Sequence, residues 1–376
     1  MNPNTLFNIG VALRATSLKI RNAEWRGRNM RWQERNDNPI DIFMCIVDHY
    51  EPQVGRPARE KSRERVEDWL NRYPQIANCH RDAEGMPPKH SFFYPWDEYD
   101  SWELDRVAEL CRAGFGEIEL HLHHQDDTDA TLRHKLRDAK TAFQRHGGLT
   151  RWPDGKVAWG FIHGNWALDN SRQDSGRNYC GVNNELTVLQ EEGCYADFTF
   201  PAWKQLAQPR KLNSIYYAID DPKRPKSYNT GRNACVACTN REGLLMIQGP
   251  LVPYVTRRSG KWRVAMDDCD IAFSQRYTPE RLDRWVEAGV HIQERPNWVF
   301  IKLHCHGAED RNRNILLGYD LEALFQDIEH RYNDGERYRL HYVTAREVFN
   351  LVKAAECGVS DIKQARDWIL KPPSYT

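Results

Sequence analysis

The sequence lacks several features that would assign it to a class directly. Its 53 Lys and Arg residues equal its 53 Asp and Glu residues. The formal net charge of zero argues against a dominant attraction to nucleic acid or an anionic membrane, although local patches stay open. No run approaches the roughly 18 apolar residues of a membrane-spanning helix. No glycine-rich phosphate loop follows the first predicted strand, which counts against a nucleotide-binding fold.

The N-terminal region and the cysteines also lack a clear signature. The apolar run at residues 6–13 is interrupted by Asn8 and Gly10 and has no basic residues before it, so no targeting segment is predicted. Ten cysteines at irregular spacings then indicate mostly buried, reduced thiols in a cytoplasmic protein. Cys235 and Cys238 have the spacing of a zinc-finger pair, but no second pair exists, so two unrelated cysteines are expected.

Strand-like and helix-like stretches alternate along most of the chain. Strands are predicted at residues 40–47, 90–94, 117–123, 156–162, 195–200, 298–305 and 338–343. Helices are predicted at residues 59–77, 102–112, 129–145, 184–192, 279–288 and 320–332, and after a capping box at residues 344–347. Such alternation predicts a parallel sheet, either open or closed into a barrel.

The stretch at residues 117–127 carries the strongest chemical signal. Its first seven residues alternate, so Glu119, His121 and His123 are expected on one face of a strand, and two acids follow. A polar strand face in water is the plain interpretation, but a carboxylate and two imidazoles on one face favour a metal or catalytic site.

Polar residues at the ends of predicted strands favour a barrel, because the C-terminal strand ends of a barrel converge on one face. These residues are Asp48, His121, His123, His163, Asp197, His304 and His306. The predicted fold is an α/β, distorted (β/α)7–8 barrel at residues 39–355 with a long β-rich insertion at about 204–276. A basic extension at residues 1–38, which includes the Trp- and Arg-rich stretch 21–35, precedes it, and a tail at residues 356–376 follows.

The order of these motifs resembles the polysaccharide deacetylase family (carbohydrate esterase family 4), within the glycoside hydrolase/deacetylase barrel superfamily. The first family motif is an apolar strand that ends in two aspartates, a base and a metal ligand. The sequence here has Asp48 and His49 at those positions. The resemblance therefore implies that Asp48 is the catalytic base and His49 a metal ligand.

The second family motif places two metal-binding histidines four residues apart. Residues 117–121 match its start and map His121 onto the first histidine, but Gln125 stands where the second is expected. The second ligand is then His123 or His124, and strand alternation favours His123. The third motif is replaced by the segment 161–166.

Two further motifs complete the resemblance. Asp197 with Trp203 is similar to the aspartate/tryptophan motif after the fifth strand, and His304 resembles the acid of the final motif, with His306 as the competing choice. The expected catalytic group is Asp48, His304, His306 and Asp197. The expected substrate contacts are His163, Asn165, Trp166 and Trp96.

The resemblance implies a metal-dependent hydrolase that removes acyl groups, above all acetyl, from a polysaccharide, oligosaccharide or glycan precursor. Imidazole and carboxylate ligands suit Zn²⁺, with Ni²⁺, Co²⁺ or Mn²⁺ as alternatives. The expected partner is an acylated sugar, without nucleic acid or a transmembrane segment. A glycoside hydrolase on the same barrel, using paired carboxylates such as Asp48 and Asp197, is one alternative. A carbohydrate-binding protein without turnover is the other.

Overall fold

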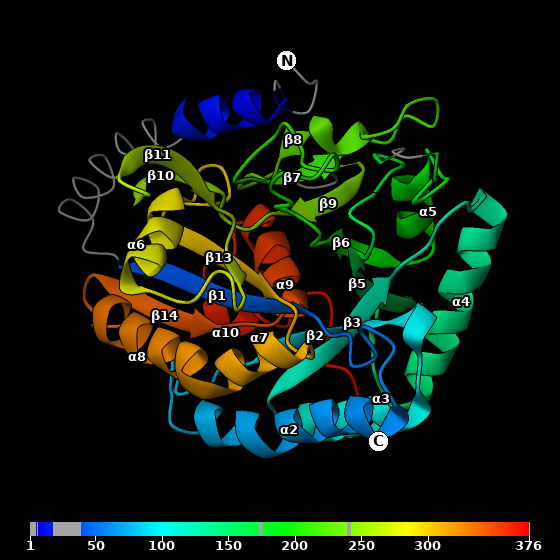
Figure 1. Ribbon diagram of the computed structural model, residues 1–376, viewed down its shortest axis with the longest axis horizontal. Helices are drawn as coiled ribbons and strands as arrows, with labels where there is room; N and C mark the ends of the chain where they lie inside the picture. The colour runs from blue at the N-terminus through cyan, green and yellow to red at the C-terminus, as the bar shows by residue number, and fades with distance from the viewer. Residues whose placement is uncertain (1–4, 6, 18–38, 173–175, 239–241, 376) are drawn as a thin grey trace.

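The computed structural model describes residues 5, 7–17, 39–172, 176–238 and 242–375. Figure 1 shows a mixed α/β architecture in which helices surround a central sheet. The basic stretch 21–35 lies outside the described residues. Every strand and helix predicted above has a counterpart within about three residues of its predicted ends.

The strands of the central sheet and of one separate hairpin follow the chain in order. They are β1 (Ile40–His49), β2 (His90–Pro95), β3 (Gly116–Leu122), β4 (Thr150–Arg151), β5 (Val157–His163), β6 (Cys194–Asp197), β7 (Ile215–Ala218), β8 (Arg232–Asn233), β9 (Leu244–Ile247), β10 (Val252–Arg258), β11 (Lys261–Asp267), β12 (Asp270–Ile271), β13 (Trp298–Cys305) and β14 (Tyr338–Tyr342).

The helices alternate with these strands. They are α2 (Arg59–Ala77), α3 (Ser101–Arg112), α4 (Asp129–Arg145), α5 (Glu185–Glu191), α6 (Pro279–Ala288), α7 (Asp310–Ile315), α8 (Leu321–Tyr332), α9 (Ala345–Glu356) and α10 (Ile362–Ala365). Short turns of other helix types are η1 (Trp96–Glu98), η2 (Ser227–Asn229) and η3 (Leu316–Asp320). A further helix covers residues 7–17.

The central sheet is mostly parallel. Its strand order is β12-β13-β1-β2-β3-β5-β6-β9-β7-β8, with β14 paired to β1 and β4 to β5. All neighbours from β12 to β9 are parallel, and β7 then runs antiparallel to both β9 and β8. The predicted α/β class with a parallel sheet is therefore confirmed. Closure of the sheet into a barrel remains a prediction.

The residues of β1 show why the sheet is buried on both faces. Ile42, Met44 and Ile46 belong to a core cluster that includes side chains of α2, α3, α4 and α8. Phe43 and Val47 point to the opposite face, into a second cluster that includes α9. Because successive strand side chains alternate between faces, every residue of β1 is buried.

The stretch expected to be an insertion contributes to two sheets. Its strands β7, β8, β9 and β12 join the central sheet, whereas β10 and β11 form a two-stranded sheet of their own. Cys235 and Cys238 form a disulfide, so the expectation that they are unrelated is wrong. Ala237 between them has a φ of 58°, and this turn brings their Cα atoms to 5.4 Å. Six of the eight free cysteines are buried, as predicted.

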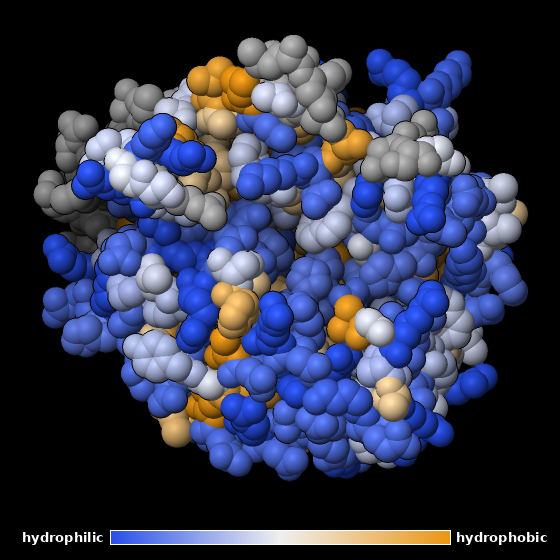
Figure 2. All heavy atoms as spheres, viewed as in Figure 1, coloured by the Kyte–Doolittle hydropathy of each residue, from blue (hydrophilic) through white to orange (hydrophobic). Residues whose placement is uncertain are grey.

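The helix at residues 7–17 lies against the expected insertion. Val11 and Ala15 pack with Leu251 and Met266 in a small separate core. Figure 2 shows that hydrophilic residues cover most of the visible face, with a hydrophobic area at its upper edge, where Figure 1 draws this helix. Within the described part of the chain, no helix has the length and apolar character needed to cross a membrane.

Candidate metal centre

Five histidines gather at the C-terminal ends of β1, β3 and β13. The ring centroid of His49 lies 4.9 Å from that of His121, 4.5 Å from that of His306 and 6.3 Å from that of His304. The rings of His121 and His123 are 4.6 Å apart. Parallel strands end at the same edge of a sheet, which explains why histidines so distant in sequence meet there.

Glu51 completes a group of possible metal ligands with two of these histidines. Its Oε1 lies 2.8 Å from Nε2 of His123 and 3.3 Å from Nε2 of His121, and the three side chains offer ligand atoms within 4.8 Å of one another. Ligand atoms about 2.1 Å from a tetrahedral zinc ion lie about 3.4 Å apart. The spacing therefore fits a small divalent cation. Glu51 was not among the predicted ligands.

The hydrogen bond of His121 leaves a lone pair directed at Glu51. Its Nδ1 lies 2.9 Å from the carbonyl oxygen of Ile162, which can only accept, so Nδ1 carries the proton. Burial lowers the pKa of His121 despite the neighbouring carboxylate, and the ring is neutral near pH 7. The Nε2 lone pair thus faces an ionised carboxylate oxygen. A cation between these two acceptors would satisfy both.

Asp97 orients the second histidine. Its carboxylate accepts from the backbone N–H of His123 at 2.8 Å and lies 3.1 Å from Nδ1 of the same residue. Burial lowers the pKa of His123, but the carboxylates of Asp97 and Glu51 outweigh it and raise the pKa to about 10. A carboxylate on the far nitrogen is the usual support of a metal-binding histidine, and a cation bound here would displace the Nε2 proton that His123 directs at Glu51. Gly164 leaves room for the ring, since a Cβ there would lie 2.3 Å from Cδ2 of His123.

His49 and Asp48 point to opposite faces of the sheet. The His49 ring contacts the histidine cluster but does not belong to the group of possible metal ligands around Glu51. The carboxylate of Asp48 lies 2.8 Å from Nε2 of His90 and accepts the backbone N–H of Gly307 at 2.6 Å. The predicted base is therefore engaged on the face covered by helices, away from Glu51.

Asp270 is a carboxylate at the cluster that the sequence reasoning missed. It pairs with His304 in the register of β12 and β13, and its Oδ1 lies 3.9 Å from Nε2 of that histidine. The same Oδ1 is buried without a hydrogen-bond partner. Burial raises the pKa of Asp270 to about 6. His306, the other predicted acid, is half-buried and stacks on His49.

Asp197 lies outside this cluster as well. Its carboxylate accepts both the backbone N–H and the hydroxyl of Thr199, at 3.1 and 2.7 Å, just after β6. The hydroxyl of Thr199 in turn accepts the backbone N–H of His163. Asp197 therefore ties the end of β6 to the end of β5, and burial raises the pKa of its carboxyl to about 7.

The expected substrate contacts are divided between two places. The Trp166 ring lies 5.3 Å from that of His49 and is half-buried, so it borders the histidine cluster. The Asn165 amide donates to the carbonyl oxygen of His124 at 2.8 Å, which gives it a structural bond in the turn. Trp96 is half-buried in η1, the turn after β2 that also carries Asp97.

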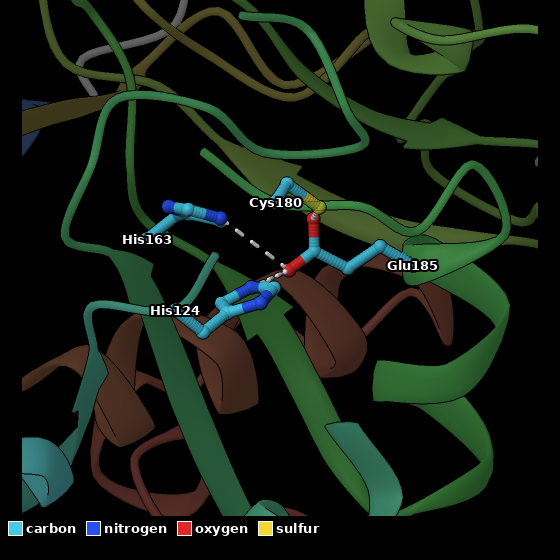
Figure 3. Close-up of side chains that lie close together, drawn as sticks. All are labelled: His124, His163, Cys180 and Glu185. Atoms are coloured by element: carbon cyan, nitrogen blue, oxygen red, sulfur yellow. Dashed lines mark hydrogen bonds and ion pairs between the residues drawn. The ribbon is translucent and has the colours of Figure 1, made fainter. Parts of the chain in front are cut away.

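His163 belongs to a second buried group. Figure 3 shows His124 and His163 directed toward the carboxylate of Glu185, with Cys180 at its other oxygen. His124 lies between two carboxylates, with Nε2 2.9 Å from Glu185 and Nδ1 3.0 Å from Asp127. Burial lowers the pKa of His124, but these carboxylates outweigh it and raise the pKa to about 9. His123 lies between Asp97 and Glu51 in the same way, so the difference between the two groups lies in their other histidines, His121 and His163.

The tautomer of His163 makes this second group a poorer cation site. The backbone N–H of Asn165 donates to Nδ1 of His163 at 3.2 Å, so the proton of the neutral ring lies on Nε2. That N–H points toward Glu185, 3.7 Å away, without a hydrogen-bond partner. A hydrogen directed into the group opposes a cation there, in contrast to the lone pair of His121.

Two other groups among the described residues have ligand atoms close together, and their neighbours argue against a metal. The carboxylates of Asp82 and Glu84, near His341, are paired with the guanidinium of Arg366 at 3.1 and 2.7 Å. The group of Asp48 with His90 and Cys305 already has its carboxylate satisfied. Glu51, His121 and His123 therefore form the best candidate.

Fold and site together define an α/β protein with a mostly parallel sheet and a histidine- and carboxylate-rich centre that could hold a divalent cation. No protein-family model matches the chain, and no curated protein matches it. The resemblance to polysaccharide deacetylases therefore depends on the motifs alone.

Proposed function

We propose that the chain is a metal-dependent hydrolase that removes acyl groups, acetyl above all, from a polysaccharide, oligosaccharide or glycan precursor. The observation that carries the proposal is the lone pair of His121 opposed to the carboxylate of Glu51, beside His123 and close to further histidines. A neutral imidazole and an ionised carboxylate facing each other without a shared proton are the arrangement of a cation site.

The proposal includes a barrel. Lys302 of β13 donates through its Nζ to the carbonyl oxygens of Phe198 and Phe200, which follow β6, at 2.8 and 2.6 Å. A Cβ at Gly249, just after β9, would lie 2.2 Å from the carbonyl oxygen of Lys302. These contacts connect β13 with the segments after β6 and β9, which lie far from it in the strand order of the sheet. They support a sheet that curves back on itself.

The chemistry can be assigned to particular side chains. A divalent cation on Glu51, His121 and His123 would supply polarisation of the acyl oxygen and activation of water. Asp270, buried and without a hydrogen-bond partner on Oδ1, would accept the proton of the attacking water in the role that the family gives to Asp48. His306 would give a proton to the leaving amine or alcohol as the acyl C–N or C–O bond breaks.

Acetate release from N-acetylated and O-acetylated oligosaccharides tests the proposal. The protein stripped with a chelator should be inactive and recover when Zn²⁺, Co²⁺, Ni²⁺ or Mn²⁺ is added. His121→Ala and Glu51→Ala should lose release, whereas His134→Ala should keep it, because His134 is exposed on α4. Full activity of the stripped protein would rule out the metal. Release of new reducing ends without acetate would instead indicate a glycoside hydrolase, and binding without release a non-catalytic protein.

A further inference from the structure

A hollow of about 640 Å³ opens at the edge of the sheet opposite to the histidine centre. It lies between residues 147–153, which join α4 to β5, and the C-terminal segment 369–374. Arg151 of β4 lines it and pairs with Val157, the first residue of β5, whereas His163 ends β5 at the edge where the histidines gather. A strand rises about 3.3 Å per residue, so about 20 Å separate the two edges. The volume is that of a small-molecule site.

The charged side chains that line this hollow are both cations. They are Arg151 and Lys371, and both are exposed. Asp154 and Asp367, the acids nearest to them in sequence, lie outside the lining and pair with other cations. Among the residues that the structure describes, no carboxylate pairs with either cation, so we name this feature the Arg151–Lys371 hollow and infer that its charge is not compensated.

Both cations also keep hydrogen-bond donors for a ligand. Arg151 donates to the carbonyl oxygen of Gly155 at 2.9 Å and to the side chain of Gln144. Lys371 donates to the carbonyl oxygen of Asp367 at 2.6 Å. A guanidinium has five N–H groups and an ammonium three, so three N–H groups of Arg151 and two of Lys371 have no partner within the described chain. The contacts that exist hold the two side chains in place without neutralising them.

The walls of the Arg151–Lys371 hollow are aromatic and aliphatic. The indole N–H of Trp152 donates to the carbonyl oxygen of Gly193 at 3.0 Å, and its ring packs edge-on against Phe349 with centroids 5.7 Å apart. The ring is thereby fixed, and it lines the hollow together with three prolines and an isoleucine. The hydroxyl of Thr150 donates to the carbonyl oxygen of Lys371, which holds the C-terminal wall against the wall of Trp152. The hollow is therefore formed before any ligand arrives.

A neighbouring hollow shows the contrast. It has a volume of about 540 Å³ and lies on the other side of residues 372–374, which border both hollows. Its cations are compensated, because Arg346 pairs with Glu117 at 2.8 Å and Lys89 pairs with Glu347 at 2.8 Å. Ion pairs that are complete within the protein leave little attraction for a charged ligand. The uncompensated charge is a property of the Arg151–Lys371 hollow.

We propose that the Arg151–Lys371 hollow binds a small molecule in which a phosphate monoester is attached to a ring, as in a sugar phosphate or a nucleoside monophosphate. A phosphate monoester carries a charge of about −1.5 to −2 at pH 7, which matches two cations. The guanidinium of Arg151 suits two phosphate oxygens at once, and Lys371 adds a point charge. The ring of the ligand would lie against Trp152. This site is separate from the proposed hydrolase centre at the opposite edge of the sheet.

Other ligands suit the hollow less well. A neutral sugar would use Trp152 but would leave both cations without a counter-ion. A single carboxylate would match one of the two charges. A nucleic acid strand needs a row of phosphate contacts along an extended basic surface, whereas the hollow offers two cations and the chain has no net charge. A phosphate monoester on a ring uses both the charges and the aromatic wall.

Titration calorimetry of the full chain with glucose 6-phosphate and with uridine monophosphate tests the proposal and distinguishes the two sources of the phosphate. At least one of them should bind with a Kd below about 1 mM, glucose should not bind, and added salt should weaken the binding. Inorganic phosphate, which lacks the ring, should bind about tenfold more weakly. The titrations use protein treated with a chelator, so that no metal ion can hold the phosphate.

Variants assign the binding to the hollow. Arg151→Gln combined with Lys371→Gln should raise the Kd about tenfold or more, and Trp152→Leu about tenfold. Lys363→Gln, at an exposed lysine of α10 outside the lining, and Arg59→Gln, at an arginine 65% exposed on α2, are matched controls that should bind as the parent does. The thermal midpoint of each variant shows whether the fold is kept. If Trp152→Leu unfolds, the charge variants decide the test.

Three results would overturn the proposal. The first is a parent protein that binds neither monoester, and the second is a charge variant that binds as tightly as the controls. The third is inorganic phosphate that binds as tightly as both monoesters, because the ring would then have no part. Since no turnover is measured and the metal is removed, failure of the hydrolase proposal would leave this result unchanged, and an empty hollow would leave the hydrolase proposal standing.

Discussion

Glu51 is the residue that supplies the carboxylate of the candidate metal centre. It lies two residues beyond the end of β1, in a turn, and its carboxylate bridges the nitrogens of His121 and His123. The alternation of residues 117–123 places both histidines on one face, and the structure brings them into one group of possible ligands. A turn has no periodicity. The sequence pattern therefore gives no reason to choose Glu51, rather than Asp48 three residues earlier, as the carboxylate of the site.

Asp97→Asn tests the support of His123. An amide in place of the carboxylate keeps the size but removes the charge that orients the ring through Nδ1. We expect metal affinity to fall about 10- to 100-fold, with the unfolding midpoint little changed. Competition with a chromogenic chelator measures the affinity, and His134→Ala serves as the control. Unaltered affinity would mean that His123 is not a ligand.

Gly164→Ala tests the space that the same ring requires. The added Cβ would lie 2.3 Å from the imidazole of His123, and this partly exposed ring would have to move. Metal affinity should drop about tenfold or more while the fold survives. Gly10→Ala is the matched control, because no atom lies within 4 Å of its added Cβ. Equal affinities in the two variants would contradict the assignment of the site.

At the scale of elements, the long helices and buried strands could be predicted, because their periodicity and caps are local properties of the sequence. The capping box of Thr344 and Glu347 is present at α9, and Pro279 opens α6. The short strand β12 has two residues, too few for any periodicity, and it carries Asp270 to the site. Its place beside β13 is decided by tertiary packing, which no local pattern reports.

Thr344→Ala measures the contribution of that cap. The Thr344 hydroxyl accepts the backbone N–H of Glu347 and donates to the carboxylate of Glu117 at 3.0 Å. Loss of both bonds should lower the free energy of unfolding by about 1–3 kcal/mol in urea titrations. Thr278→Ala, at an N-cap whose side chain makes no capping bond, should cost less. Unchanged stability of Thr344→Ala would show that the cap of α9 is not stabilising.

At the scale of the whole molecule, buried ion pairs join the C-terminal segment to the sheet. Glu347 lies 2.8 Å from Nζ of Lys89 and 3.5 Å from the guanidinium of Arg366 in the turn after α10. Arg346 pairs with Glu117 at the start of β3. These partners are far apart in the sequence, so no local motif predicts that they form a network.

This network predicts how stability depends on pH. Burial raises the pKa of Glu347, but Lys89, Arg366 and Arg346 outweigh it and lower the pKa from 4.5 to about 2. The stabilisation is complete above the ordinary pKa of 4.5 and is lost as the pH falls toward 2. Urea unfolding of the parent protein should weaken over this window, and Glu347→Gln should be less stable at neutral pH and show less change.

The two-stranded sheet of β10 and β11 has no ladder in common with the central sheet. Its tip is a turn at Ser259 and Gly260, and the chain returns to the central sheet only at β12. Substitutions along the exposed half of this hairpin can therefore accumulate without altering the strand register that brings the histidines together. The outer surface of this hairpin and the geometry of the histidine centre can therefore change independently of each other.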